Sequence, residues 1–238
     1  MNAQIIITGA NGTLGKYLAL FFMNKGYELL LISKNKKSLS SFYNKYKDKK
    51  NNNLRIFTSD FNNEKSVLKL CKDLKKVIIN PILLINNAAI HGPIGPFEEN
   101  NLNEWKKVFN INFFSHIKIT KLILGTMVKN KNGTIITIAG GGAVTPRENF
   151  NAYSSSKTAL VRFSENLSIE YAKYNINFNC ISPGVLKSNL QKEIIDNYAN
   201  LLKNNDYKKL KISQKQNIEN LSKVSKFISF LISKKGKK

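Results

Sequence analysis

Short apolar runs and longer amphipathic segments alternate along the whole chain. The runs are rich in isoleucine and leucine and predict strands at residues 4–8, 27–32, 54–58, 82–86, 133–139 and 176–182. Between them, apolar positions recur with helical spacing, and the longest such segments span about 103–129 and 151–173. Apolar strands that alternate with helices indicate a parallel sheet covered on both faces. We therefore predict an α/β protein with a doubly wound parallel sheet in three layers, α/β/α.

Length and composition favour one domain over residues 1–238. The 238 residues are enough for one sizeable core, and no repeat, linker or bilayer-spanning apolar run interrupts them. The apolar stretch 5–7 is too short for a signal peptide. Cys71 and Cys180 are far apart, in an expected helix and an expected buried strand, and their spacing does not suit a metal site. Such cysteine usage favours a reducing, cytoplasmic location.

The net charge of +23 is compatible with a nucleic acid or an anionic membrane as partner. The excess is almost all lysine, because Arg55, Arg147 and Arg162 are the only arginines. Guanidinium is the usual group for bidentate contacts to phosphates and bases. Lysine, asparagine and isoleucine are enriched together along the chain, as an AT-biased coding sequence would produce. We therefore expect neither a nucleic-acid nor a membrane partner.

A glycine-rich turn follows the first expected strand. Gly9, Gly12 and Gly15 stand between the strand 4–8 and an apolar segment, 14–23, that has helical spacing. Glycines in this position let the backbone approach a pyrophosphate, whose charge is stabilised at the helix N-terminus. The order of strand, glycine turn and helix therefore predicts a dinucleotide site.

Tyr153 and Lys157 are the strongest candidates for chemistry. Their four-residue spacing places them one turn apart on one face of a helix. An ammonium close to a phenol favours the phenolate and lowers its pKa. The pair is thus a candidate proton donor and acceptor.

Further motifs appear in order along the chain. Asp60 follows the third strand, Asn-Asn-Ala-Ala at 86–89 follows the fourth, Asn112 lies in the long helix, and Pro-Gly-Val-Leu-Lys-Ser at 183–188 follows the sixth. With the glycine turn and the Tyr153 pair, these motifs resemble the compact, single-domain branch of the short-chain dehydrogenase/reductase family over nearly the whole chain.

The resemblance implies a Rossmann fold, a small-molecule substrate and a homo-oligomer, dimer or tetramer. It also implies hydride transfer between a nicotinamide and a carbonyl or alcohol carbon. The residues expected to bind the cofactor are Thr8, Gly9, Asn11, Gly12, Thr13, Leu14, Gly15, Ser33, Lys34, Asp60, Phe61, Asn87, Ala88, Ala89, Tyr153, Lys157, Pro183, Gly184, Val185 and Ser188.

By the same resemblance, Tyr153 moves the proton that accompanies the hydride. Lys157 lowers the pKa of the tyrosine and hydrogen-bonds the nicotinamide ribose. Asn112 bends its helix and holds a water that links Lys157 to solvent. The alternative for Asn112 is a buried asparagine that satisfies backbone groups.

The end of the second strand bears on the choice of cofactor. Ser33 stands where an acidic residue would select NAD, and Lys34 is placed to pair with a 2′-phosphate. We expect NADP in preference to NAD, with NAD as the alternative.

Several features depart from the family pattern. Gly12 and Thr13 resemble the spacing of the extended branch, although the short chain, the 86–89 segment and Asn112 favour the compact one. The family's serine, thirteen residues before the tyrosine, is absent, because Ala139 and Gly140 occupy the position. A lost oxyanion donor costs about a hundredfold to a thousandfold in rate. Thr137, Thr145 and the backbone amides of 140–142 are candidate replacements.

The residues that choose the substrate are less defined. His91 and Arg147 flank the expected cleft, and Arg147 suits a carboxylate or phosphate. Residues 189–215 stand where the family has a substrate lid. Residues 218–233 predict the last helix, and the family's seventh strand does not follow it. The two hypotheses for function are an NADP-preferring oxidoreductase and a dinucleotide-binding protein with weak or no turnover.

Overall fold

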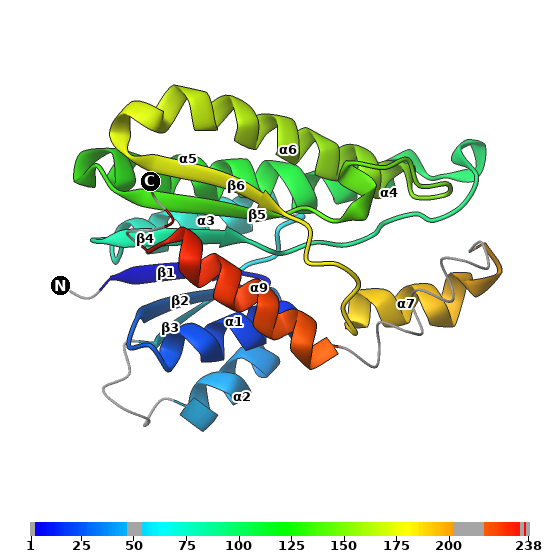
Figure 1. The fold of residues 1–238 in the computed structure, drawn as a ribbon. Helices are drawn as coiled ribbons and strands as arrows, with labels where there is room; N and C mark the ends of the chain where they lie inside the picture. Colours follow the sequence, from blue (N-terminus) through cyan, green and yellow to red (C-terminus); the bar gives the residue numbers. More distant parts are fainter. Residues whose placement is uncertain (1–2, 47–53, 202–216, 234–235, 237–238) are drawn as a thin grey trace.

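A single parallel sheet forms the centre of the molecule. The computed structural model describes residues 3–46, 54–201, 217–233 and 236. The strands are β1 (Gln4–Thr8), β2 (Glu28–Ser33), β3 (Leu54–Thr58), β4 (Pro81–Asn86), β5 (Gly133–Ile138) and β6 (Ile176–Ile181), in the order β3-β2-β1-β4-β5-β6 (Figure 1). All neighbours pair in parallel. The predicted doubly wound sheet is confirmed, and the expected strands differ from these bounds by at most one residue at either end.

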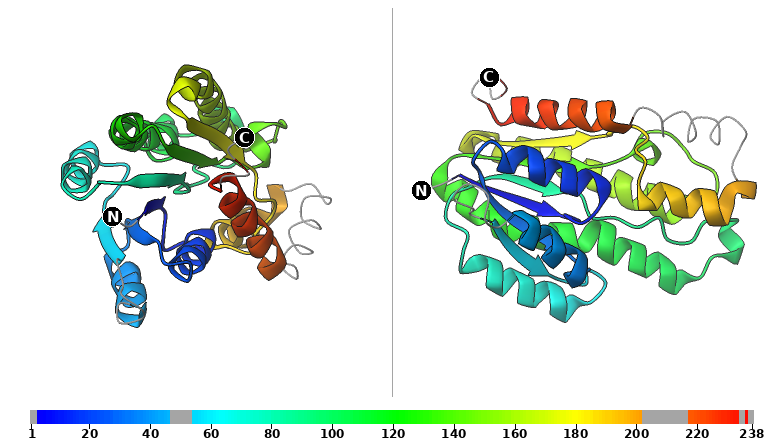
Figure 2. Two further views of the ribbon diagram at one scale, coloured as in Figure 1. Left: turned by 60° about the vertical axis from the view of Figure 1, so that its left-hand side comes forward. Right: turned by 90° about the horizontal axis from the view of Figure 1, so that it is seen from below.

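Helices cover both faces of the sheet (Figure 2). The described helices are α1 (Thr13–Met23), α2 (Lys36–Tyr46), α3 (Glu64–Lys75), α4 (Leu102–Phe109), α5 (Ser115–Asn130), α6 (Asn151–Tyr171), α7 (Asn189–Tyr198) and α9 (Asn217–Leu231). The last helix agrees with the expected 218–233. On the question of a seventh strand, most of the residues after 233 lie outside the described part of the chain.

Each strand is apolar on both sides because helices pack against both faces of the sheet. In β1, Ile5 and Ile7 join a core cluster with α1 and α9, whereas Ile6 joins a second cluster with α3 and α5. All three isoleucines are fully buried. Each strand thus contributes to two cores, as expected of a sheet sandwiched between helices.

The segment expected as one helix from 103 to 129 is divided. It contains α4 and α5, and a π-helical turn at Asn110–Phe114 joins them. A π-turn inserts a wider loop of backbone into a helix and occurs often at functional sites. The expectation of one continuous α-helix was therefore wrong at its centre, and the π-turn lies where Asn112 was expected to bend the helix.

The expectation that Cys180 is buried in a strand was also wrong. Cys180 lies in β6, as predicted, but its side chain is exposed, whereas Cys71 in α3 is half-buried. In the described residues β6 is the edge strand and pairs only with β5. An edge strand lacks the cover that a second neighbour supplies.

The order of the strands creates a crevice above β1 and β4. The chain runs outward from β1 to β2 and β3, and then returns to the other side of β1 to form β4. Connections on opposite sides leave an opening at the carboxyl ends of these strands, where ligands of such sheets bind. The sites after β1, β2, β4 and β5 converge there.

Candidate active site

A cavity of about 840 Å³ opens at the carboxyl ends of the strands. Its wall contains all the predicted site residues except Thr8, Gly15, Asn112 and Thr137. These four are buried and do not line the cavity. The cavity thus brings together residues from Gly9 to Glu193.

The glycine turn allows close packing at one end of the cavity. Gly9 has a φ of +62°, and a Cβ built on it would lie 2.9 Å from the Cα of Ala88. A Cβ on Gly15 would lie 2.4 Å from the carbonyl oxygen of Gly9. Gly12 is exposed and caps α1 without a side chain, and the first turn of α1 contains no acidic residue. This arrangement leaves a helix N-terminus open to an anion, and it fits a dinucleotide pyrophosphate.

Thr8 and Asn87 connect the glycine turn to the end of β4. The Thr8 hydroxyl accepts hydrogen bonds from the backbone N–H groups of Asn87 at 2.9 Å and Ala88 at 3.1 Å. The Asn87 amide in turn donates to the carbonyls of Thr8 at 2.9 Å and Gly9 at 3.2 Å. Thr8 therefore supports the wall of the cavity, and Asn87 forms part of it.

Helix α6 places Tyr153 and Lys157 one turn apart against the end of β5. The Tyr153 hydroxyl donates to the carbonyl of Ala139 at 3.3 Å, and the Lys157 ammonium donates to the carbonyl of Ile138 at 2.8 Å. The side chains are 8% and 1% exposed, respectively. Burial lowers the pKa of Lys157 to about 8. Two consecutive backbone carbonyls thus hold the predicted pair at the cavity wall.

Burial is the largest influence on the pKa of Tyr153. Burial raises the pKa of Tyr153, and the positive charge of Arg147 opposes this rise without cancelling it. The Lys157 ammonium bonds the Ile138 carbonyl and lies 5.9 Å from the centre of the tyrosine ring. The expectation that Lys157 lowers the pKa stays a prediction, because here the desolvation of the phenol outweighs the opposing charge of Arg147.

Asn112 occupies the π-turn and is fully buried. Its Oδ1 accepts from the Ile90 N–H at 2.9 Å, and its Nδ2 donates to the Ile90 carbonyl at 2.9 Å and to the Ser156 hydroxyl at 3.0 Å. Both Nδ2 protons are thus used within the protein. The side chain joins the loop after β4 to α5 and α6, which agrees with the alternative of a structural asparagine.

No side-chain hydroxyl stands at the position of the expected serine. Ala139 is buried, and its carbonyl accepts the tyrosine hydroxyl. Gly140 has a φ of +122°, and a Cβ there would lie 2.8 Å from the tyrosine oxygen. Thr137 is buried and contacts Ser164 at 3.3 Å, away from the cavity wall, whereas Thr145 lines the cavity and donates to the Gly141 carbonyl at 3.1 Å. Of the two threonines, Thr145 alone lies at the cavity.

His91 and Arg147 lie beside the tyrosine. The His91 ring packs edge-on against Tyr153, with 4.9 Å between ring centres, and against Phe150, with 5.7 Å. Burial, followed by the charges of Arg147 and Lys157, lowers the pKa of His91 to about 3. The Arg147 guanidinium lies 3.6 Å from the centre of the Phe150 ring. The imidazole is therefore neutral near pH 7, and Arg147 supplies positive charge at this end of the cavity.

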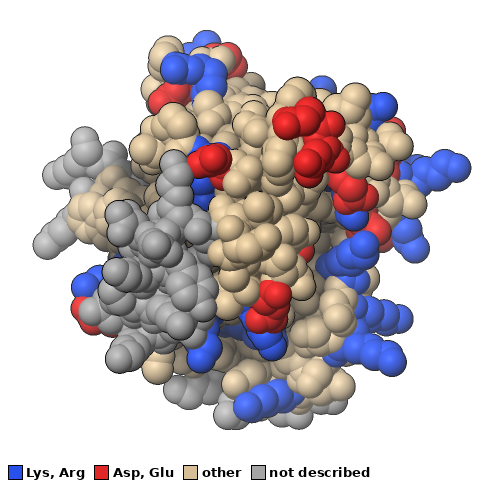
Figure 3. Space-filling model, turned by 90° about the vertical axis from the view of Figure 1, so that its right-hand side faces the viewer, with Lys and Arg blue, Asp and Glu red and all other residues tan. Residues whose placement is uncertain are grey.

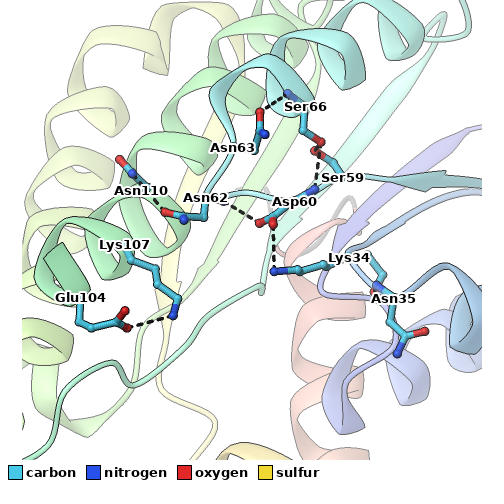
Figure 4. A network of polar contacts seen from close by, with 11 residues as sticks. Lys34, Asn35, Ser59, Asp60, Asn62, Asn63, Ser66, Glu104, Lys107 and Asn110 are labelled. Carbon is cyan, nitrogen blue, oxygen red and sulfur yellow. Dashed lines mark hydrogen bonds and ion pairs between the residues drawn. The ribbon is translucent and has the colours of Figure 1, made fainter.

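Polar residues from two neighbouring strands close the opposite end (Figure 4). Lys34, after β2, forms an ion pair of 2.9 Å with Asp60, after β3. Ser33, at the end of β2, is buried and accepts a hydrogen bond from the Asn35 N–H at 3.3 Å. The residues predicted to recognise the adenosine half thus lie together, but Lys34 already has an anionic partner.

The expected lid at 189–215 falls only partly within the described residues. Helix α7 begins after Ser188, whose hydroxyl accepts from the Gln191 N–H at 3.3 Å. Ile194 of α7 is buried against Ile94 and Phe150. The first part of the segment is therefore packed over the cavity, and residues 202–215 lie outside the described part of the chain.

Several cavity residues had no recognisable signal in the sequence. Ile90 and Ile111 line the wall, but an apolar residue near a strand or in a helix looks like core. Gln191 and Glu193 also line it; they belong to the segment 189–215 expected as the lid, but nothing singled out either residue. Their roles depend on how α7 and the π-turn are placed.

The basic excess is not continuous over the face that Figure 3 shows. Both acidic and basic side chains are visible there, separated by large uncharged areas. Within the described residues, no helix combines the length and apolar character needed to cross a membrane.

Comparisons with known proteins agree with this geometry. Residues 3–199 match the family model for short chain dehydrogenase. The 3-oxoacyl-[acyl-carrier-protein] reductase of Buchnera aphidicola subsp. Schizaphis graminum is 33% identical over 190 residues, which cover 79% of this chain and 75% of the reductase.

Solved structures with similar folds include two with a bound cofactor. 4-Hydroxyisoleucine dehydrogenase complexed with NADH has a TM-score of 0.81 and 24% identity, over 99% of this chain and 93% of that one. A variant of actinorhodin polyketide ketoreductase with NADPH has a TM-score of 0.85 and 20% identity, over 99% and 92%. With the match over residues 3–199, the chain belongs to the short-chain dehydrogenase/reductase family of oxidoreductases.

Proposed function

We propose that this protein is an NADP(H)-preferring oxidoreductase that interconverts a small polar carbonyl compound and its alcohol. The observation that carries the proposal is the placement of Tyr153 and Lys157. Both are buried in the wall of a cavity whose other end is a glycine turn and an open helix N-terminus. A proton carrier and a dinucleotide site thus share one cavity, as hydride transfer to a carbonyl requires.

The roles of the protein groups follow from their contacts. Bound nicotinamide supplies the hydride acceptor or donor. Tyr153 gives its proton to the carbonyl oxygen during reduction and takes it back during oxidation. Lys157, held by the Ile138 carbonyl, has two further ammonium protons with which to bond the cofactor ribose. Asn112 keeps the loop after β4 in place beneath the pair.

Oxyanion stabilisation must come from groups other than a serine. The backbone amides of Gly140–Gly142 are the donors that we assign to this role, because these residues line the cavity beside Tyr153. The Thr145 hydroxyl can join them only by releasing the Gly141 carbonyl to which it donates. Arg147 adds positive charge near the phenol. This charge suits a substrate that bears a carboxylate or phosphate besides its carbonyl.

The preference for NADP(H) rests on Ser33 and Lys34. A neutral Ser33 does not repel a 2′-phosphate as a carboxylate would, and Lys34 is 71% exposed in its side chain and able to pair with one. The structural relatives include one solved with NADH and one with NADPH, so this fold accommodates both cofactors.

The test is turnover of a panel of carbonyl compounds with NADPH. We expect reduction of at least one hydroxy- or oxo-acid, phosphorylated sugar or diketone, and its loss by at least a hundredfold in Tyr153→Phe. The substitution removes only the phenolic oxygen, so cofactor affinity serves as the control and should change little. Activity retained in Tyr153→Phe contradicts the assignment.

A second candidate is a dinucleotide-binding protein with weak or no turnover. The lack of a hydroxyl at Ala139 and Gly140 and the raised pKa of Tyr153 favour it. It predicts tight cofactor binding without turnover across the same panel.

A further inference from the structure

Asp60 is an anion fixed at the adenosine end of the cavity. Its Oδ1 accepts a hydrogen bond from the Asn62 N–H at 2.9 Å, and its own N–H donates to the Ser66 hydroxyl at 3.0 Å. Ser66 in turn contacts the Ser59 hydroxyl at 3.1 Å, and Asn63 caps α3 through the Ser66 N–H (Figure 4). The carboxylate is therefore held by the backbone of Asn62, and the backbone of Asp60 is held by Ser66 in the first turn of α3.

Lys34 is the movable partner of this anion. Its ammonium lies 2.9 Å from Asp60 Oδ2, and its side chain is 71% exposed, against 35% for Asp60. Although partial burial opposes the shift, the hydrogen bonds from Lys34 and Asn62 hold the pKa of Asp60 below its ordinary value. Asp60 is thus ionised near neutral pH, and Lys34 reaches across from the end of β2 to meet it.

We propose that Asp60 is a specificity-determining residue, which holds Lys34 and thereby limits the preference of this protein for NADP(H) over NAD(H). The inference rests on the proposed function. NAD(H) leaves the Lys34–Asp60 pair undisturbed. NADP(H) brings a 2′-phosphate that competes with Asp60 for the same ammonium and is repelled by the carboxylate.

The charges of Lys34 and Asp60 explain why the loss of the carboxylate should favour NADP(H). Lys34 and Asp60 cancel each other, so the intact pair presents almost no net charge to a phosphate. Replacing the carboxylate by an amide leaves one positive charge and frees the ammonium to turn. Interactions between exposed charges are modest, so the expected gain is about three- to tenfold in NADPH affinity relative to NADH.

The experiment measures dissociation constants for NADPH and NADH by nicotinamide fluorescence, without substrate, near pH 7 and at low salt. In Asp60→Asn, the ratio of the NADH constant to the NADPH constant should rise about three- to tenfold. Any contact of Asp60 with the adenine is common to both cofactors and cancels in this ratio. In Lys34→Met, the ratio should fall, and in the double variant the Asp60→Asn gain should shrink, because Asp60 acts largely through Lys34.

Asp73→Asn is the matched control. Asp73 pairs with Lys76 at 3.6 Å, with side-chain exposures of 43% and 75%, and neither residue lines the cavity. The substitution removes the same charge at a similar exposure and should leave the ratio unchanged. An unchanged or lower ratio in Asp60→Asn, or an equal rise in Asp73→Asn, overturns the inference. If the unmodified protein binds neither cofactor, the proposed function itself fails.

Discussion

Two consecutive carbonyls at the end of β5 position the reactive pair. Ile138 receives the Lys157 ammonium and Ala139 receives the Tyr153 hydroxyl, so residues 138 and 139 define where the phenol lies. Residue 139 binds the phenol through its carbonyl, so a hydroxyl added to its side chain would lie beside the phenol. A Cβ at 140, in contrast, would collide with the tyrosine oxygen.

We predict that Ala139→Ser increases kcat. Serine adds one hydroxyl at a buried position whose carbonyl already touches Tyr153, and one positioned donor is worth about a hundredfold in related oxyanion sites. We expect a gain of about tenfold or more, measured by steady-state kinetics on the best substrate of the panel.

Gly140→Ser is the matched comparison at the adjacent position. The backbone there has a φ of +122°, and the new Cβ would stand 2.8 Å from the tyrosine oxygen. Activity should fall. Equal effects of the two substitutions, or no gain from Ala139→Ser, would show that the missing hydroxyl does not limit turnover.

At the scale of elements, the π-turn between α4 and α5 connects the site to the fold. It carries Asn112, whose three hydrogen bonds tie the loop after β4 to α6. The helical spacing of 103–129 is continuous in the sequence, and only the bend expected at Asn112 from the family resemblance points to an irregularity there. The turn is thus a tertiary feature that lets a buried amide reach two partners.

Asn112→Ala should destabilise the protein. It leaves the N–H and carbonyl of Ile90 without their partner, and each buried unsatisfied group costs about 1–3 kcal/mol. We expect a loss of about 2–4 kcal/mol in the free energy of unfolding, measured by urea denaturation.

Asn110→Ala is the control in the same π-turn. Its amide makes one exposed, 3.3 Å contact with Asn62, so its loss should cost less than about 0.5 kcal/mol. Similar losses in both variants would mean that the turn itself, and not the contacts of Asn112, sets the stability.

At the scale of the whole molecule, burial controls the charge of both histidines in the chain. His91 lies beside the cavity and His116 lies in α5, where it is fully buried. Burial lowers the pKa of each to about 3, with Lys157 adding to the shift in both and Arg147 in His91. The core therefore accepts these rings only in their neutral form.

This arrangement makes stability fall in mild acid. Each histidine has a folded pKa far below its unfolded value of about 6.5. Its contribution to the free energy of unfolding is therefore complete above about pH 6.5 and is lost as the pH falls toward 3. Between about pH 6.5 and 5 we expect a loss of up to about 2 kcal/mol per histidine in the free energy of unfolding.

His116→Leu tests the effect without changing a cavity residue. Neither ring nitrogen of His116 makes a hydrogen bond of normal geometry among the described residues, although a contact with the Asn112 backbone opposes the shift of its pKa. A leucine therefore leaves at most that one backbone group without its contact. Urea denaturation at several pH values above about 5 should show about half the original slope. A slope that does not change assigns the acid sensitivity to other groups.

The alternation of strands and helices follows from local pattern, because a segment that is apolar on both sides has only one place in an α/β sandwich. The same holds for the glycine turn, Tyr153 and Lys157, whose spacing along a strand end or a helix is itself the signal. The sequence by itself therefore determined the fold, the family resemblance and most of the residues around the cavity.

Contacts between segments that are distant in sequence were decided only by the tertiary structure. Lys34 meets Asp60 because β2 and β3 are neighbours in the sheet. Cys180 is exposed because β6 is the edge strand of the sheet within the described residues. The pKa of Tyr153 depends on how completely the phenol is buried and on where Arg147 lies. Desolvation and pairing are properties of the packed chain, and residue spacing along the sequence does not encode them.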